Sequence, residues 1–406
     1  MLDTIAKILE KYTCNSCLGR SFAQLLSGYS NEERGKTLRT ALAMEIDSGK
    51  EFELEPSNFY GFKFRNNEEF AKKIKQPGKC WVCNNLFENL DKIAVKVKNK
   101  VKVEFKTFLV GSRPSKNLIE KEEELWEKVG IDWCEPLKAE INREIGKRLE
   151  KILKAKVDLK KPDIVILIDL ENFGISIKVN PLYIFGYYKK LVRGIPQCKW
   201  GTPKKYRTSV EQIIAKPIIS ATKGKNYKLH GAGREDISAR CLAWRAFVLE
   251  ILEPKKRAVD LKKITKQIKG KVVVKSLKYA DMATVRKIKS AKPDKTYKVI
   301  VQLEKAVDKK DLKKLKMLIG TIQQRTPSRV VHRRADMLRK REIKTIGWKR
   351  VSKKEIEMKI KAAAGLYIKE LISGDNGRTK PSIAELLGCK AECKELDVIG
   401  IEKIKI

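Results

Sequence analysis

The stretch PDIVILIDLENFGISIKVNPLYIFGYY, residues 162–188, decides the expected fold of the first half of the chain. Apolar and β-branched residues run through it in three short blocks, and a turn is expected at residues 172–174, a pattern typical of closely joined β-strands. Just upstream, NLIEKEEELWEKVG and EPLKAEINREIGKRLEKIL carry the apolar spacing of amphipathic helices. We therefore expect a compact α/β domain that ends near Tyr188.

Further upstream, the sequence predicts a strand and a helical body. IAVKVKNKVKVEFKTFLVG, residues 93–111, alternates apolar and basic residues, so a strand here would present one lysine-lined face. Residues 20–46 read as helices, with Asn31 as an N-cap. We place the domain boundary after residue 190, which gives domains at 1–190 and 191–406.

The second half is expected to be α+β, because strands and helices do not alternate regularly. No GxGxxG motif opens a helix after a strand, and no GxxxxGK[ST] motif is present, which disfavours a Rossmann-type methyl-donor or nucleotide site and a P-loop. Helices are expected at residues 280–288, 309–319 and 383–387. The expected strands cover residues 227–229, 247–252, 272–274, 297–303 and 398–404.

Charge is the strongest global feature of the chain. Ninety Lys and Arg residues face fifty Asp and Glu residues, which gives a net charge of +40 over 406 residues. A polyanionic partner would relieve the resulting self-repulsion, and nucleic acid is favoured over solvated lysine-rich surfaces alone. No apolar run is long enough for a transmembrane helix, and no lipidation motif or secretory cleavage site is found, so we expect a cytoplasmic protein without a membrane partner.

Four of the nine cysteines form two CxxC pairs, CNSC at Cys14 and Cys17 and CWVC at Cys80 and Cys83. An odd number of cysteines argues against a secreted disulfide framework. Each pair alone could be a chance pairing or a redox pair. Together they favour one structural zinc ion bound by four thiolates, although the gap between the pairs exceeds the usual ~20 residues.

The segment LHGAGREDISAR, residues 229–240, holds the main candidate for catalysis. With only two histidines in the chain, a histidine-based triad is nearly excluded, and carboxylate chemistry remains. Asp236 follows a glycine-rich turn that can approach a ligand closely, and neighbouring arginines would keep it ionised. Glu235 would point elsewhere, so the two are not expected to form an acid/base pair. The alternative is that Asp236 caps a helix or forms a local salt bridge.

Two later segments add to this candidate. QRTPSRVVHRRAD supplies four guanidinium groups suited to phosphate contacts, at Arg325, Arg329, Arg333 and Arg334, although a solvated basic face would have the same composition. In GLYIKELISGDNGRT, a strand over residues 365–369 would place Tyr367 and Lys369 on one face.

Together, LHGAGREDISAR, QRTPSRVVHRRAD and GLYIKELISGDNGRT closely resemble the archaeal and eukaryotic tRNA pseudouridine synthases that carry an N-terminal THUMP-type module. CNSCLGR, CWVCN and VGSRP resemble the N-terminal half of that family, so the likeness spans most of the chain. It implies an α+β protein in which a zinc-bearing, THUMP-like α/β module for RNA binding precedes a mixed-sheet pseudouridine synthase domain.

The resemblance also implies a reaction: isomerisation of uridine to pseudouridine in the T-arm of tRNA, at uridines 54 and 55 in tRNA numbering, without an organic or nucleotide cofactor. Asp236 would be the essential aspartate and nucleophile, and Lys369 the cation paired with it. Tyr367 would lie near the base, and Tyr297 would stack on it.

One departure from the family pattern bears on the shape of the catalytic loop. The family usually has Gly-x-Gly-Arg-Pro-Phe after the aspartate segment, whereas this chain has CLAWRAF, with Trp244 and Ala246 where Gly and Pro are expected. The alternatives are therefore a non-catalytic tRNA-binding or chaperone protein and a THUMP-bearing methyltransferase or thiolase. The missing glycine-rich loops weigh against the last two.

Overall fold

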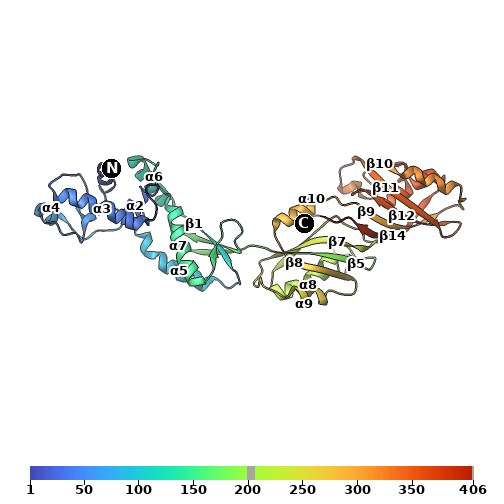
Figure 1. Cartoon of the computed structure of the whole chain (residues 1–406), viewed down its shortest axis with the longest axis horizontal. Helices are drawn as coiled ribbons and strands as arrows, with labels where there is room; N and C mark the ends of the chain where they lie inside the picture. The colour runs from blue at the N-terminus through green and yellow to red at the C-terminus, as the bar shows by residue number, and fades with distance from the viewer. Residues whose placement is uncertain (199–205, 405–406) are drawn as a thin grey trace. The chain divides into compact units, whose positions relative to one another are not determined.

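The computed structural model describes residues 1–198 and 206–404, without the side chain of Arg333. The chain divides into two compact units, Met1–Asn180 and Pro181–Ile406. Each unit contains one sheet, and Figure 1 labels several helices and strands of each unit. The boundary differs from the one expected after residue 190, because the strand at Leu182–Lys190 pairs only with strands of the second unit.

The first unit joins a helical body to a small four-stranded sheet. The sheet has the order β2-β1-β3-β4, in which β1 runs parallel to β2 and β3, and β4 is antiparallel to β3. Its helices are α1 (Leu2–Ile8), α2 (Asn15–Arg20), α3 (Asn31–Asp47), α4 (Glu68–Lys73), α5 (Leu90–Lys100), α6 (Lys116–Val129) and α7 (Leu137–Leu153), with 3-10 turns η1 (Pro56–Phe59) and η2 (Leu86–Asn89). Its strands are β1 (Thr107–Arg113), β2 (Lys156–Val157), β3 (Ile164–Asp169) and β4 (Ile175–Val179).

The predicted strand over residues 93–111 is wrong in its first part, which forms helix α5. Leu90, Ile93, Ala94 and Val97 are buried on one side of that helix, which is helical spacing, and α5 packs against α7. A short run of alternating valines and lysines fits both the two-residue period of a strand and the helical period of about 3.6 residues. Tertiary packing therefore decided between strand and helix. The expected strand does form at β1, and both helices expected upstream of residue 162 are present as α6 and α7.

The second unit is built on one ten-stranded sheet of order β13-β10-β11-β12-β9-β14-β7-β5-β8, with β6 paired to β7. Neighbouring strands are antiparallel except for β14 and β7. The strands are β5 (Leu182–Lys190), β6 (Asn226–Gly231), β7 (Arg240–Leu252), β8 (Val272–Ala280), β9 (Lys295–Leu303), β10 (Gly320–Arg325), β11 (Leu338–Arg350), β12 (Glu355–Ala362), β13 (Thr379–Lys380) and β14 (Ala391–Ile401). The helices are α8 (Val210–Thr222), α9 (Leu261–Gln267), α10 (Met282–Ser290), α11 (Ile368–Ser373) and α12 (Ile383–Leu387), with η3 (Asp311–Leu318) and η4 (Ser328–Arg333).

This architecture confirms the expected α+β class with a mixed sheet. Each of the five expected strands overlaps an observed strand, but β7, β8 and β14 are longer than expected, and β14 ends at Ile401 and not at residue 404. The expected helix at residues 309–319 is a 3-10 helix, η3. Four strands of this unit, β10, β11, β12 and β13, were not predicted from the sequence. In β11, lysines and arginines hide the alternation of a mostly exposed strand.

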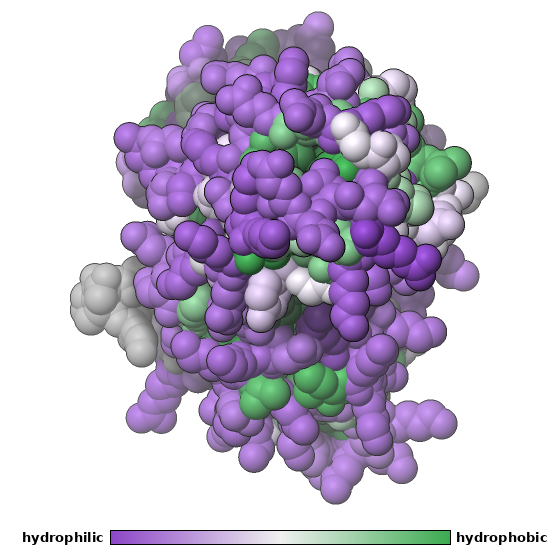
Figure 2. Space-filling view, turned by 90° about the vertical axis from the view of Figure 1, so that its left-hand side faces the viewer, coloured by the Kyte–Doolittle hydropathy of each residue, from purple (hydrophilic) through white to green (hydrophobic). Residues whose placement is uncertain are grey.

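Two further observations concern the surface. No helix among the described residues is long and apolar enough to cross a membrane. Hydrophilic side chains cover most of the face shown in Figure 2, and hydrophobic residues appear there only in small, separate patches.

Candidate active site

Asp236 lies in the loop between β6 and β7, and the turn before it depends on glycine. Gly233 has φ +79°, in the left-handed region that side chains disfavour, and a Cβ there would lie 3.2 Å from Nη1 of Arg245. Ala232 is fully buried beneath the turn. The loop is therefore fixed against the sheet, and Asp236 follows it at the surface.

The carboxylate of Asp236 is held by Ser238, two residues along the chain, and by Lys369 and Arg329 from distant parts of the chain. Its Oδ1 accepts from the backbone N–H of Ser238 at 3.1 Å, from Oγ of Ser238 at 2.9 Å and from Nζ of Lys369 at 3.3 Å. Its Oδ2 lies 3.5 Å from Nη1 of Arg329. The side chain keeps 24% of its surface exposed, so a ligand can reach it.

The electrostatic surroundings of Asp236 favour its ionised form. Burial raises the pKa of the carboxyl, but the hydrogen bonds from Ser238 and the charges of Lys369 and Arg329 outweigh burial, and the net pKa is lowered. Asp236 is therefore an anion at neutral pH without being sealed in the core.

Lys369 reaches this carboxylate from helix α11 and not from a strand. The predicted strand over residues 365–369 is wrong: Tyr367 is the extended N-cap residue of α11, and Lys369 lies in its first turn. Gly365 has φ +90°, which breaks any strand here. The ammonium also donates to Oγ of Ser238 at 2.8 Å, so Lys369 and Ser238 hold the carboxylate together.

Of the four arginines singled out in the sequence, one lies near Asp236 and one near Tyr367. Arg329, in η4, donates through Nε to Oε1 of the buried Glu370 at 2.6 Å while its Nη1 faces Asp236. Arg334 donates to the hydroxyl of Tyr367 at 2.6 Å. Arg325 instead pairs with Asp336 at 3.4 Å. The side chain of Arg333 lies outside the described residues.

Tyr297 stands on β9 in the core and makes no described contact with Asp236. It is 8% exposed, and burial raises the pKa of its phenol to about 12. It belongs to the same core cluster as Ala239 and Ile368, which flank Asp236 and Lys369. Tyr297 therefore belongs to the core that also holds residues near these two charged side chains.

Glu235 points away from Asp236, as expected, and forms a buried polar network behind the loop. Its Oε2 lies 3.0 Å from Nε of Arg245 and accepts from the hydroxyl of Tyr188 at 2.9 Å; Glu235 and Arg245 side chains are both 0% exposed. Gln197 donates to the same hydroxyl at 2.8 Å and to the carbonyl of Gly233 at 3.0 Å. The two adjacent carboxylates thus have separate environments.

Lys190 is a further supporting residue, and it was not predicted from the sequence. Its buried ammonium donates to the carbonyls of Ile195 at 3.1 Å, Asp236 at 3.0 Å and Ile237 at 3.3 Å. It therefore ties the end of β5 to the backbone of the Asp236 loop. The sequence could have indicated this role, because Lys190 falls at a position of β5 that faces the core. A charged group in the core needs a buried partner.

The segment CLAWRAF, which departs from the family's Gly-x-Gly-Arg-Pro-Phe pattern, does not form a loop. These residues lie inside β7, where Ala246 is buried and the ring of Trp244 lies 4.4 Å from Nζ of Lys275. Arg245 donates to the carbonyl of Ala232 at 2.8 Å, so the residue that the chain keeps from the pattern supports the turn before Asp236.

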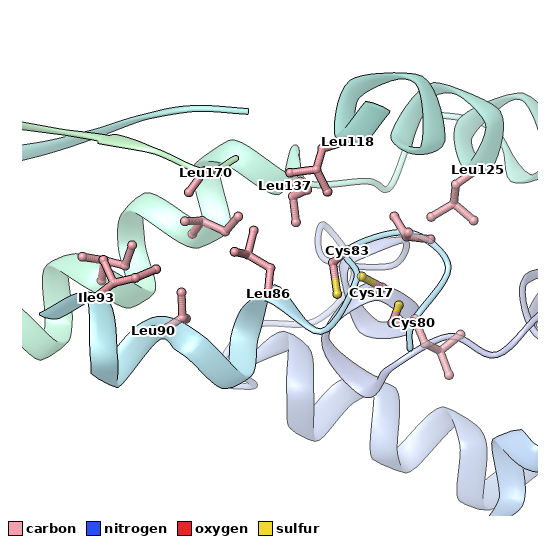
Figure 3. Close-up of a cluster of buried hydrophobic side chains, with 14 of the residues drawn as sticks. Cys17, Cys80, Cys83, Leu86, Leu90, Ile93, Leu118, Leu125, Leu137 and Leu170 are labelled. Carbon is pink, nitrogen blue, oxygen red and sulfur yellow. The ribbon is translucent and has the colours of Figure 1, made fainter. Parts of the chain in front are cut away.

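In the first unit, the four CxxC cysteines form one cluster, as expected. Their sulfur atoms all lie within 4.8 Å of one another, and the sulfurs of Cys17, Cys80 and Cys83 gather at one point in Figure 3. Tetrahedral zinc with Zn–S bonds of about 2.3 Å needs sulfurs about 3.8 Å apart. The Cys14 and Cys83 sulfurs are 3.6 Å apart, so the donor set fits a four-thiolate metal site.

A close helix crossing brings the first pair of cysteines into place. A Cβ added to Gly19 would lie 1.8 Å from the carbonyl oxygen of Asn31, and one added to Gly35 would lie 1.9 Å from that of Asn15. Only glycines allow α2 and α3 to approach this closely. Next to the cluster, buried Arg20 donates to Sγ of Cys17 at 3.5 Å and faces Glu122 and Glu140 at 3.7 and 3.6 Å.

Comparison with known proteins places the chain in a class of RNA-modifying proteins. The family model described as "Pus10, C-terminal" matches residues 183–402, and "Pus10 THUMP domain, archaeal" matches residues 91–169. The "tRNA pseudouridine synthase Pus10" of Methanothermobacter marburgensis is 39% identical, over 98% of this chain and 98% of that protein. The protein of the same name from Pyrococcus furiosus is 37% identical, over 99% and 98%.

The chain therefore belongs to the Pus10 family. Among solved structures, a Cbf5-Nop10-Gar1 complex gives a TM-score of 0.32 at 18% identity, covering 54% of this chain and 50% of that one. The family assignment rests on the sequence matches, which extend over both units.

Proposed function

We propose that this chain isomerises uridine to pseudouridine in tRNA, with Asp236 as its essential carboxylate. The observation that carries the proposal is the ionised, partly exposed Asp236, held between Lys369 and Arg329. Relatives that match nearly the whole chain are named tRNA pseudouridine synthases, which supports the substrate class.

The reaction requires a carboxylate and no redox partner. The bond between uracil N1 and ribose C1′ breaks, a bond between C5 and C1′ forms, the proton on C5 leaves and N1 gains a proton. Electrons balance within one nucleotide, so no organic cofactor is needed. An ionised Asp236 can serve as the nucleophile at C1′, and Lys369 keeps it charged and oriented.

The tyrosines and arginines would hold the target nucleotide. A uridine within a folded arm must leave its stack to reach a carboxylate, and an aromatic face can receive the base. We assign this role to Tyr297 and Tyr367, the latter oriented by Arg334. Arg325, Arg333 and Arg334 would contact the RNA backbone, whereas Arg329 would act directly beside Asp236. The T-arm uridines 54 and 55 are the proposed targets.

The cysteine cluster would hold a structural zinc ion. Four thiolates leave no open coordination position, so the ion would stabilise the first unit and take no part in the reaction. The lysine-rich first unit would bind the phosphate backbone of tRNA, which fits the match of this unit to a THUMP family model.

The test is pseudouridine mapping on an unmodified tRNA transcript with no added cofactor. We expect modification by the wild type and none by Asp236→Asn, which keeps the size of the side chain and removes its charge. Asp311→Asn is the matched control, because among the described residues the ion pair of Asp311 is an exposed one with Lys314, and its loss should leave activity unchanged.

The outcomes separate the proposal from its rivals. Wild-type turnover in Asp236→Asn would contradict a catalytic role for this carboxylate. Binding of tRNA without any pseudouridine in the wild type would favour a non-catalytic tRNA-binding protein instead.

A further inference from the structure

One face of the sheet at β5, β7 and β8 carries aromatic rings and lysines. Tyr188 and Phe247 pack into the core beneath α8 and α9, so strand alternation turns Tyr187, Lys189 and Trp244 to the opposite face. In Figure 1, α8 and α9 lie on one side of these strands and α10 on the other.

Helix α10 covers only part of this second face. Its Val285 and Ile288 pack with Phe185, Ala246 and Val248 in a small core cluster. Trp244 belongs to none of the core clusters of the described residues and is half-buried. A tryptophan on a central strand thus keeps part of its surface exposed.

Two ammonium groups gather on that ring. Nζ of Lys275, on β8, lies 4.4 Å from the ring centroid of Trp244, and Nζ of Lys189, on β5, lies 4.7 Å from it. Nearby, Nζ of Lys278 lies 5.0 Å from the ring of Phe185. Because β5 lies between β7 and β8 in the sheet, the indole and the two nearest lysines meet above β5.

These lysines lack neutralising partners. Within residues 1–198 and 206–404, no ion pair joins Lys189, Lys275 or Lys278 to a carboxylate. Cation–π contacts stabilise exposed ammonium groups only weakly, by about 0.5–1 kcal/mol each. Two like charges beside one open indole therefore favour a ligand that brings a negative charge and a flat ring together.

We propose that this face binds an unpaired RNA nucleotide, with the base stacked on Trp244 and the phosphate between Lys189 and Lys275. The chemistry combines an aromatic platform with adjacent cations, which is how proteins hold single-stranded nucleic acid independently of sequence. The choice of RNA as the polyanion rests on the proposed function. The surface is separate from the residues around Asp236, so it would add affinity without taking part in the reaction.

The test uses the full chain and a labelled single-stranded RNA of about ten nucleotides, a typical site size. The probe contains no uridine, so that it offers the active site no substrate, and binding is followed by fluorescence anisotropy. We expect Trp244→Ala to raise the Kd about tenfold and Trp244→Phe to raise it less. The double variant Lys189→Gln/Lys275→Gln should reduce the slope of log K against log salt by about 0.7 for one lost phosphate contact.

A matched double variant, Lys225→Gln/Lys298→Gln, removes the same charge from lysines that pair with Glu253 and Glu357. It should leave the salt slope unchanged. Equal effects of the two double variants, or unchanged binding by Trp244→Ala, would overturn the proposal. So would variants that bind the RNA normally but lose binding to anionic phospholipid vesicles.

Pseudouridine formation on tRNA is measured separately. We expect Trp244→Ala to raise the KM for tRNA more than it lowers kcat. If the wild type forms no pseudouridine, the proposed function fails, and the oligonucleotide result still decides the present inference.

Discussion

At the scale of single residues, Glu235 and Asp236 show how two adjacent carboxylates acquire different roles. Glu235 is buried against Arg245 and Tyr188, and Asp236 remains partly open beside Lys369 and Arg329. Neighbouring side chains in an extended segment point in opposite directions, so one supports the loop and the other faces solvent.

The burial of Glu235 predicts that its loss lowers the free energy of unfolding far more than the loss of an exposed glutamate does. Glu235→Gln leaves the buried guanidinium of Arg245 without a counter-charge, which should lower the free energy of unfolding by about 3–5 kcal/mol. Glu253→Gln, at an exposed pair with Lys225, should change it by less than ~0.5 kcal/mol. Urea denaturation measures both, and equal stabilities would contradict a structural role for the Glu235–Arg245 pair.

The lowered pKa of Asp236 predicts the acid limb of the pH–rate profile. Its folded pKa lies below the unfolded value of about 3.9, so its contribution to stability is present above that pH and is lost as pH falls through the folded pKa. Asp236 should therefore stay ionised between about pH 5 and pH 8, and its protonation should cause no loss of activity in this range.

Lys369→Met removes one of the charges that lower this pKa. The acid limb should then move to higher pH, and the rate at neutral pH should fall because the carboxylate loses an orienting donor. Rates measured from about pH 3 to pH 8 on the same tRNA, a range that reaches below the ordinary carboxyl pKa of about 3.9, test this shift. A lower rate with an unmoved limb would mean that Lys369 positions substrate only.

At the scale of elements, the glycine-dependent crossing of α2 and α3 positions the first CxxC pair, and the fold of the first unit brings the second pair within 4.8 Å of it. The cluster joins residues near the N-terminus to the turn before η2, and its surroundings are the buried core of the first unit. A bound metal would therefore link segments that are far apart in the sequence.

We expect about one zinc ion per chain by metal analysis, and a lower melting temperature after chelation. Cys80→Ser should lose zinc and destabilise the first unit, whereas Cys134→Ser, outside the cluster, should retain the metal. Stoichiometric zinc in Cys80→Ser would contradict the four-thiolate site.

At the scale of the whole molecule, the net charge of +40 governs binding to RNA. If about six phosphates are contacted, the slope of log K against log salt should be roughly −4 to −5 for tRNA. Affinity measurements between low and physiological salt test this value. A nearly flat dependence would show that the charge serves surfaces that tRNA does not touch.

The sequence by itself determined the residue types available to the sites: the two CxxC pairs, the glycine turn before Asp236 and a lysine at position 369. Each of these features depends on residue type and local spacing, which a short segment carries. It also determined the α+β class and most strand positions, because apolar periodicity is local.

Only the tertiary structure decided the partners. Residues 93–100 fit a strand pattern until packing against α7 selected the helix α5, and Leu182–Lys190 joined the second unit because β7 and β8 offer it hydrogen-bond partners there. Lys190 and Glu235 gained their roles from groups that meet them only after folding. The physical reason is that strand pairing and the burial of charge depend on contacts between distant segments, which local sequence patterns do not encode.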